Sequence, residues 1–343
     1  MRRHSKSILL LFFILIILFI LSEFSLRVIN HYRPKTFDKA FGPMFKEVNN
    51  PNLNYILNPS YKSNLYIINS KGFRSREFTF EKGDNIFRIM ILGDSVTFGM
   101  GVYNTDKIYP NILEDIMNNT SDTNIKFEVI NAGVPGYNAI QELNFLKDIA
   151  MQYKPDMIIL GICLNDWETV STITGEGIVV DGVAESFSIK KSLKKSLFIN
   201  FVWINGKNLL HKLFDYEPNL TNSIVNDRGW GKMEMAIKEM NDFTKANNID
   251  FLSVIFPVRS QISNPKAENR PQEDLKLFFG ANEIYFLDLF QTFSQNAEKD
   301  LFMDKAGVHF SEFGHRITAE TLYEKILPII GYNRLSIRKK LGS

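Results

Sequence analysis

Five short hydrophobic runs recur along the chain between residues 86 and 290. They are FRIMIL from Phe87, FEVINA from Phe127, MIILGIC from Met157, FLSVIF from Phe251 and IYFLDL from Ile284. Each run is continuous rather than alternating, which is typical of strands buried on both faces. Helical segments are expected between and after them, at 109–118, 138–151, 233–246 and 318–330. This alternation predicts an α/β fold of three α/β/α layers, with a central parallel sheet of about five strands.

A different hydrophobic pattern opens the chain. Residues 1–7 are basic, and an unbroken apolar run follows from Ile8 to Leu21. Such a start is typical of a secretory signal or a membrane anchor. The run is short for a full span, but apolar residues extend it to 29, and no small-x-small cleavage site follows. We therefore favour an uncleaved transmembrane anchor over 8–29, with the remaining chain translocated to the periplasm or the cell exterior.

The rest of the chain divides by composition. Residues 30–85 are rich in Pro and Asn and are interpreted as a linker and lead-in. Residues 86–332 form the α/β domain, and 333–343 are a basic tail. An insertion at 168–229 interrupts the domain with an expected hairpin around Asp181-Gly182 and a basic amphipathic stretch. That stretch is either a cap helix packed on the domain or a lid that contacts substrate or membrane.

Composition excludes several classes of function. The net charge is only +2, which gives no overall field for binding nucleic acid. The single cysteine, Cys163, allows no disulfide within the chain, and the five histidines lack metal-ligand spacing. Neither a P-loop nor a strand-linked GxGxxG is present. We therefore expect no nucleotide, no metal and no other cofactor.

Polar residues follow the predicted strands, where an open parallel sheet binds its ligands. Ser95 follows the first strand, Gly136 lies beyond the second, Asn165 follows the third, and His309 precedes the last helix. A serine hydroxyl becomes a nucleophile when a base such as histidine takes its proton. Glycine N–H groups and an Asn amide are suitable donors to the resulting oxyanion. Alternatively, Ser95 is a helix cap and His309 a surface residue.

Taken in order, GDS, NAGVPG, LND and GVHFSEFGH resemble the four sequence blocks of the SGNH hydrolases, a branch of the GDSL esterase family. The resemblance extends from about Phe87 to Ile330 and implies a flavodoxin-like sheet. It implies that Ser95 is the nucleophile and His309 the base. It also implies an oxyanion hole made by the Ser95 N–H, a glycine N–H and the Asn165 amide. Gly136 is the preferred glycine and Gly133 the alternative, whereas His315 is expected to be structural.

Two positions depart from the family pattern. Cys163 stands where the family usually has a glycine, two residues before Asn165. The family's Asp-x-x-His block has Ala306 in place of its acid, and the nearest acid is Asp304, five residues before His309. A turn through Gly307 would still bring Asp304 to His309. Otherwise a backbone carbonyl orients the imidazole and the site is a dyad.

These features predict a membrane-anchored, extracytoplasmic serine esterase that works through an acyl-enzyme. Because relatives with an N-terminal membrane segment resemble proteins acting on cell-surface polysaccharide, an O-acetylated glycan is the expected substrate. Three alternatives stay open. The same residues would support an O-acyltransferase if a sugar hydroxyl replaced water, the anchor suits a lipid esterase, and Ala306 suits a non-catalytic scaffold on a decayed hydrolase fold.

Overall fold

The computed structural model describes residues 44–50, 52–120, 124–163, 171–174, 177–180, 228–263, 270–304 and 307–330, with helical residues between 11 and 28. The chain divides into two units, one of residues 1–39 and 183–219 and the other of residues 40–182 and 220–343. In the first unit only the helical residues between 11 and 28 are described. No helix within the described ranges is long and apolar enough to span a bilayer. The anchor expected at 8–29 stays a prediction.

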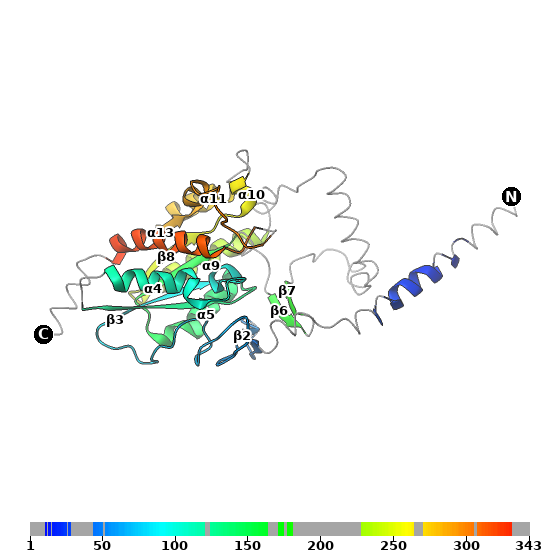
Figure 1. The fold of residues 1–343 in the computed structure, drawn as a ribbon, viewed down its shortest axis with the longest axis horizontal. Coiled ribbons are helices and arrows are strands. Elements are labelled where there is room, and N and C mark those ends of the chain that lie inside the picture. The colour runs from blue at the N-terminus through cyan, green and yellow to red at the C-terminus, as the bar shows by residue number, and fades with distance from the viewer. Residues whose placement is uncertain are drawn as a thin grey trace. The chain divides into compact units, whose positions relative to one another are not determined.

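The second unit is built on a five-stranded sheet (Figure 1). Its strands are β3 (Ile86–Gly93), β4 (Lys126–Gly133), β5 (Met157–Ile162), β8 (Asp250–Ile255) and β9 (Phe286–Asp288). They lie in the order β4-β3-β5-β8-β9 and every neighbouring pair is parallel. The α/β class and the parallel sheet are thereby confirmed. Because the connections run outward from β3 to β4 and then return to β5, the topological switch lies between β3 and β5.

Two separate hydrophobic cores cover the two faces of the sheet. Along β3, Ile89 and Ile91 enter one core, while Met90 and Leu92 enter the other, as the two-residue period of a strand requires. On the first face lie α4 (Tyr109–Thr120) and α13 (Glu312–Ile330), which contact each other (Figure 1). On the second face lie α5 (Ala139–Asp148), α9 (Arg228–Ala246) and α11 (Arg270–Ala281). The predicted three layers are therefore present.

Residues 44–85 are part of this packing, although their composition suggested a lead-in. β1 (Phe45–Glu47) and β2 (Tyr55–Leu57) form an antiparallel pair. The side chains of Tyr55, Leu57 and Phe73 are each at most 1% exposed and lie in the same core as Met90. The domain therefore begins well before the expected boundary at residue 86. Its buried residues come in short stretches separated by turns, so no hydrophobic run as long as those of the central strands marks them in the sequence.

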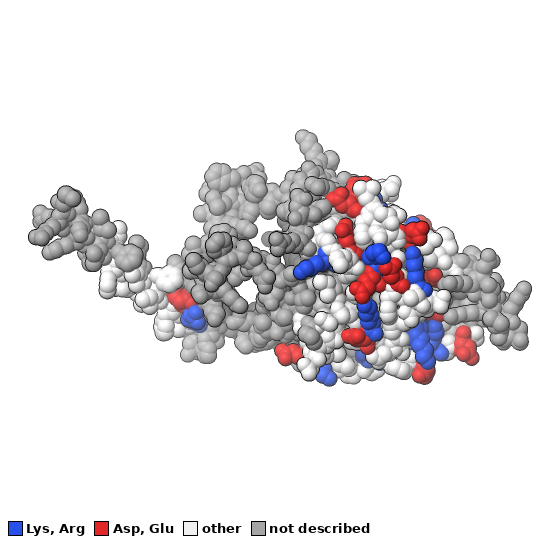
Figure 2. Space-filling view, turned by 180° about the vertical axis from the view of Figure 1, so that it is seen from behind, with Lys and Arg blue, Asp and Glu red and all other residues white. Residues whose placement is uncertain are grey.

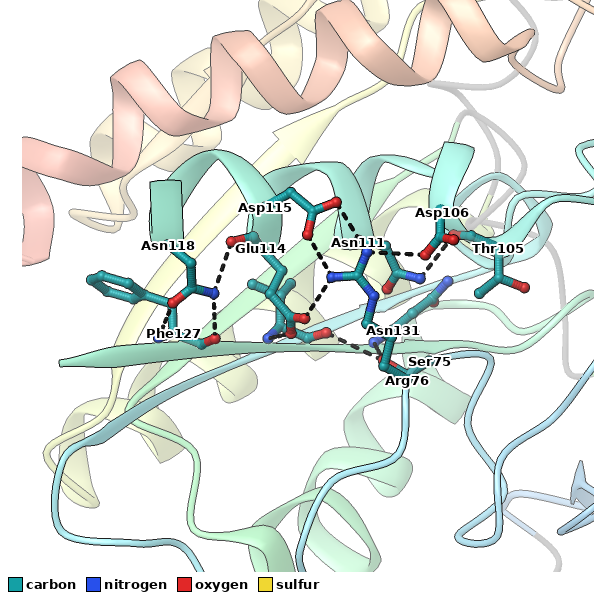
Figure 3. Close-up of polar contacts among 11 residues, drawn as sticks. Ser75, Arg76, Thr105, Asp106, Asn111, Glu114, Asp115, Asn118, Phe127 and Asn131 are labelled. Carbon is teal, nitrogen blue, oxygen red and sulfur yellow. Dashed lines mark hydrogen bonds and ion pairs between the residues drawn. The ribbon is translucent and has the colours of Figure 1, made fainter. Parts of the chain in front are cut away.

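The outer edge of β4 is covered by side chains (Figure 3). Asn118 of α4 donates to the Phe127 carbonyl and accepts from the Phe127 N–H, both at 2.9 Å. Glu114 accepts from the Val129 N–H at 2.8 Å, and the Ser75 hydroxyl donates to the Val129 carbonyl at 3.2 Å. These contacts satisfy edge groups that would otherwise be free to pair with another strand.

Arg76 joins residues 44–85 to the helix above that edge (Figure 3). Its guanidinium lies 2.9 Å from the carboxylates of Asp106 and Glu114 and 2.6 Å from that of Asp115. Burial raises the pKa of the Glu114 carboxyl, while hydrogen bonds from the Val129 N–H and Arg76 oppose that effect. The segment before the sheet is thus tied to α4 by ion pairs, while its apolar side chains pack in the core on the other face of the sheet.

The expected insertion at 168–229 is described only in part. β6 (Ser171–Thr174) pairs antiparallel with β7 (Gly177–Val180), and both strands lie before Asp181. The turn expected at Asp181-Gly182, the basic amphipathic stretch and the tail at 333–343 lie outside the described residues. On the face seen in Figure 2, acidic and basic side chains are interspersed, in keeping with the net charge of +2.

Candidate active site

Ser95 lies at a tight turn between β3 and the short helix α3 (Ser95–Phe98). The helix is capped by Asp94, whose Oδ1 accepts from the Val96 N–H at 2.8 Å. Gly93 ends the strand with φ +152°, and a Cβ there would lie 2.1 Å from Thr97 Oγ1. Only glycine fits this approach. The turn therefore places the Ser95 hydroxyl at the carboxyl end of β3, beside the topological switch.

His309 contacts this hydroxyl directly. Its Nε2 lies 2.9 Å from Ser95 Oγ, and its Nδ1 is hydrogen-bonded to Asp304 Oδ2. The three side chains are partly buried and form one continuous hydrogen-bonded chain. The structure thus brings together the predicted nucleophile, base and acid. This is the arrangement in which a histidine takes a serine proton while a carboxylate fixes its tautomer.

The loop from Asp304 to His309 accommodates the long spacing between acid and base. Gly307 has φ +70°, and its N–H and that of Val308 both donate to Asp304 Oδ1, the second at 3.0 Å. Burial raises the pKa of the Asp304 carboxyl, but hydrogen bonds from the Val308 N–H and from His309 outweigh it and leave the pKa below its ordinary value. Asp304 is therefore ionised. Residues 305–306, including Ala306, lie outside the described residues.

Arg259 fastens this loop to the domain. Its backbone N–H donates to the Gly307 carbonyl at 2.8 Å, and its guanidinium donates to the Phe302 carbonyl at 2.9 Å. A further, longer contact of 3.3 Å reaches the Asp304 carbonyl. The segment that contains the acid is therefore held on both sides of the turn. Arg259 was not among the residues expected from the sequence, because a single Arg after a strand gives no recognisable signal.

The two candidate glycines for the oxyanion hole differ in their hydrogen bonds. The Gly133 N–H donates to Asn131 Oδ1 at 2.9 Å and is already engaged. The Gly136 N–H has no acceptor among the described residues, and Gly136 lies in a turn with φ +81°. This difference favours Gly136 as the donor, as expected from the family pattern. Asn165, the expected side-chain donor, lies outside the described residues, and both roles stay predictions.

Asn131 is a further residue that the sequence patterns did not single out. Its amide donates to the Thr97 carbonyl at 3.0 Å, in the helix that begins with Ser95. Its carbonyl oxygen accepts the Gly133 N–H, so one buried side chain joins the turns after β3 and β4. A polar residue at the end of an otherwise apolar strand was the available signal. Arg74 and Tyr66, which hold the loop after α3, were also missed.

His315 and Cys163 lie in the core. His315 is buried in α13, where its Nδ1 accepts from the Tyr109 N–H at 3.3 Å and its ring stacks on that of Tyr109. Burial, with smaller contributions from Arg74 and His309, lowers the pKa of His315 to about 3. It is a neutral, structural histidine, as the sequence predicted. Cys163 is likewise buried. Across the described ranges, no group of three His, Cys, Asp or Glu side chains is arranged to hold a metal ion.

Comparison with known proteins identifies the class to which this site belongs. The sequence model of the GDSL-like Lipase/Acylhydrolase family matches residues 91–317, which is more than half of the chain. The chain belongs to this family, and it is a hydrolase of ester bonds of the SGNH type. No curated protein matches the sequence.

Three solved structures illustrate the similarity. TesA is 12% identical at a TM-score of 0.44, over 71% of this chain and 99% of TesA. The acetyl xylan esterase AlAXEase is 16% identical at a TM-score of 0.45, and the match covers 70% of this chain and 100% of AlAXEase. The psychrotrophic esterase EstA from Pseudoalteromonas sp. is 15% identical at a TM-score of 0.41, and the match covers 70% of this chain and 96% of EstA. At these identities the likeness concerns the fold alone.

Proposed function

We propose that this chain is a serine esterase in which Ser95 attacks the ester carbonyl and His309 takes the serine proton. The observation that carries the proposal is the hydrogen-bonded chain from Ser95 through His309 to the ionised Asp304. The ionised carboxylate stabilises the imidazolium that forms and holds its Nδ1–H. Attack then needs no rearrangement of side chains, because base and hydroxyl are already within hydrogen-bond distance.

The remaining steps use the same residues. The N–H groups of Ser95 and Gly136 and the Asn165 amide hold the oxyanion of the tetrahedral intermediate. When this collapses, His309 donates its proton to the departing alcohol and Ser95 stays acylated. Water then attacks the acyl-enzyme with His309 as base, and the acid is released. Each proton that the imidazole accepts is returned within the cycle, so the reaction needs no cofactor.

We further propose that the substrate is an O-acetylated glycan at the cell surface and that residues 8–29 anchor the enzyme in the membrane. One sequence feature and one resemblance support this. Residues 1–7 are basic and the run behind them is apolar, which favours translocation of the chain beyond the anchor. Relatives that join such a segment to this domain resemble proteins that act on cell-surface polysaccharide. A sugar hydroxyl in place of water would turn the same acyl-enzyme into an O-acyltransferase.

The test is covalent labelling of the full-length protein with a fluorophosphonate probe, which needs an activated serine but not the right substrate. We expect labelling at Ser95 and its loss in Ser95→Ala and His309→Ala. Ser294→Ala is the matched control, because the Ser294 side chain has no hydrogen bond among the described residues. A folded wild-type protein that takes up no label would contradict the proposal and favour a non-catalytic scaffold. Hydrolysis rates with acetyl and with long-chain p-nitrophenyl esters are then compared. Faster hydrolysis of the acetyl ester favours the glycan substrate, and faster hydrolysis of the long-chain ester favours a lipid substrate.

A further inference from the structure

A fully buried arginine lies behind the nucleophile turn. Arg74 has no exposed surface, and its guanidinium donates to the carbonyls of Phe98 at 2.9 Å, Gly99 at 2.6 Å and Val102. These three acceptors belong to the end of α3 and the loop that follows it. One side chain therefore holds three carbonyls at the end of the helix that begins at Ser95 and in the loop immediately after it.

Tyr66 assists in the same place. Its ring centroid lies 4.8 Å from the Arg74 guanidinium carbon, and the Phe98 ring lies at the same distance. The Tyr66 hydroxyl oxygen also accepts from the Gly101 N–H at 3.0 Å. The loop 98–102 is thus held at both its carbonyl and its N–H groups by residues that precede the sheet.

This loop in turn holds Ser95. The N–H groups of Gly99 and Met100 both donate to the Ser95 carbonyl, at 3.1 and 2.9 Å. Because α3 has only four residues, its own hydrogen bonds cannot fix its position. A displacement of the loop therefore shifts the backbone of Ser95, and this shift changes the distance from Ser95 Oγ to His309.

The contacts of Arg74 suit positioning better than stability. Within the described part of the chain, no carboxylate pairs with it, and burial lowers its pKa to about 10. A buried charge is weak evidence for stabilisation, because desolvation opposes the contacts it gains. A planar fork that reaches three carbonyls at once is, by contrast, a geometric device that an ammonium group cannot reproduce.

We infer that Arg74, supported by Tyr66, is a positioning residue that holds the Ser95 turn in register with His309. The inference rests on the proposed esterase function. Arg74 lies outside the residues that match the family model, 91–317. Residues 44–85 therefore contribute to the reactivity of the site as well as to its core, although none of their side chains needs to touch the substrate.

The experiment compares two buried arginines in the full-length protein. Arg88 is the matched control, since it too has no exposed surface and donates to the Tyr153 and Thr79 carbonyls, but it pairs with Glu128 at the opposite end of β3. The variants are Arg74→Lys, Arg74→Met, Tyr66→Phe and Arg88→Lys. For each, the rate of fluorophosphonate labelling per folded molecule is measured together with the thermal midpoint, kcat and KM.

We expect Arg74→Lys and Arg74→Met to label Ser95 about 10- to 100-fold more slowly, with kcat lowered and KM changed by less than about twofold. Tyr66→Phe should give a smaller loss in the same direction. Arg88→Lys should lower the thermal midpoint while its folded molecules label within about twofold of the wild-type rate. Arg74 variants that label as fast as Arg88→Lys would overturn the inference. A folded wild-type protein that does not label would instead remove the proposed function, and this inference with it.

Discussion

His309 Nε2 lies 2.9 Å from Ser95 Oγ, although 214 positions separate the two residues in the chain. The serine is delivered by the end of β3, and the histidine by the loop in front of α13, which packs on the same face of the sheet as α4. Their contact therefore depends on two turns that are each fixed independently, one by Asp94 and Gly93 and the other by Asp304 and Gly307. Substitutions in the second turn test that dependence directly.

Replacing Asp304 with Asn should slow ester hydrolysis and Ser95 labelling by a factor on the order of 10³–10⁴. The amide retains the size of the carboxylate but lacks the charge that stabilises the imidazolium, and it permits the wrong His309 tautomer. Rates with p-nitrophenyl acetate and with the fluorophosphonate probe measure this. The control is Asp300→Asn, an exposed acid four residues before Asp304, which should leave both rates within about twofold. Equal rates for Asp304→Asn and wild type would mean that the site works as a dyad.

Gly307→Ala should lower both stability and labelling rate. A Cβ at this position would lie 2.1 Å from the Arg259 Cβ, and the backbone has φ +70°, which L-residues adopt at a cost of about 1–2 kcal/mol. The loop must shift, and Asp304 shifts with it. Urea unfolding and labelling of the folded fraction measure the two effects.

Gly280→Ala is the matched control for that substitution. Gly280 lies in α11 with nothing within 4 Å of an added Cβ, so alanine there should stabilise the protein by up to about 1 kcal/mol. Labelling should be unchanged. If Gly307→Ala behaves like Gly280→Ala, the turn is not what brings Asp304 to His309.

Much of the fold was predictable because a parallel strand that is buried on both faces has a continuous hydrophobic sequence. The runs beginning at Phe87, Phe127 and Met157 coincide with β3, β4 and β5 within a residue or so. Less could be predicted where the hydrophobic pattern is weak. α13 begins at Glu312 rather than near 318, since its first turn is polar on one side. Residues 44–85 were missed because their buried side chains come in short stretches between turns.

The residues of the candidate site were predictable where a sequence motif specifies the residue type. They were not predictable where their role depends on their position in the folded chain. Ser95 and His309 follow from short motifs. Asp304 was reachable only through the conformational freedom of Gly307, because the spacing itself argues against it. Arg74 and Asn131 act through backbone carbonyls, and a donor to a carbonyl can come from many residue types. No sequence pattern therefore distinguishes them.

Asn165→Ala should lower kcat by about 10²–10³-fold with little change in KM. The expected Asn165 amide contacts the oxyanion only once the carbonyl has been attacked, so its loss affects the transition state rather than substrate binding. Steady-state kinetics with p-nitrophenyl acetate measure this. A KM effect alone would assign Asn165 to substrate binding instead of the oxyanion hole.

A chain that begins at residue 86 should fail to fold, whereas one that begins at residue 40 should fold. The shorter chain loses buried side chains including Tyr55, Leu57 and Phe73, each worth about 1.5–3 kcal/mol of burial. Together they approach the whole stability of an ordinary domain. Cooperative thermal unfolding, followed by circular dichroism, separates the two. A chain from residue 86 with the full-length midpoint would restore the boundary expected from composition.

His315 should make stability depend on pH in a defined window. Burial lowers its pKa from 6.5 to about 3. Between these values the unfolded chain binds a proton that the folded protein does not, so stability falls as pH falls, by up to about 1.4 kcal/mol per pH unit. His315→Asn keeps an acceptor for the Tyr109 N–H but cannot take up the proton. Other groups, Asp304 among them, titrate alike in both proteins and cancel in the difference. The measured quantity is the free energy of unfolding of wild type minus that of the variant. This difference should be constant above pH 7 and should become steadily smaller as the pH is lowered below about 6.5. Parallel curves would show that His315 takes up a proton as readily in the folded protein as in the unfolded chain, against its burial.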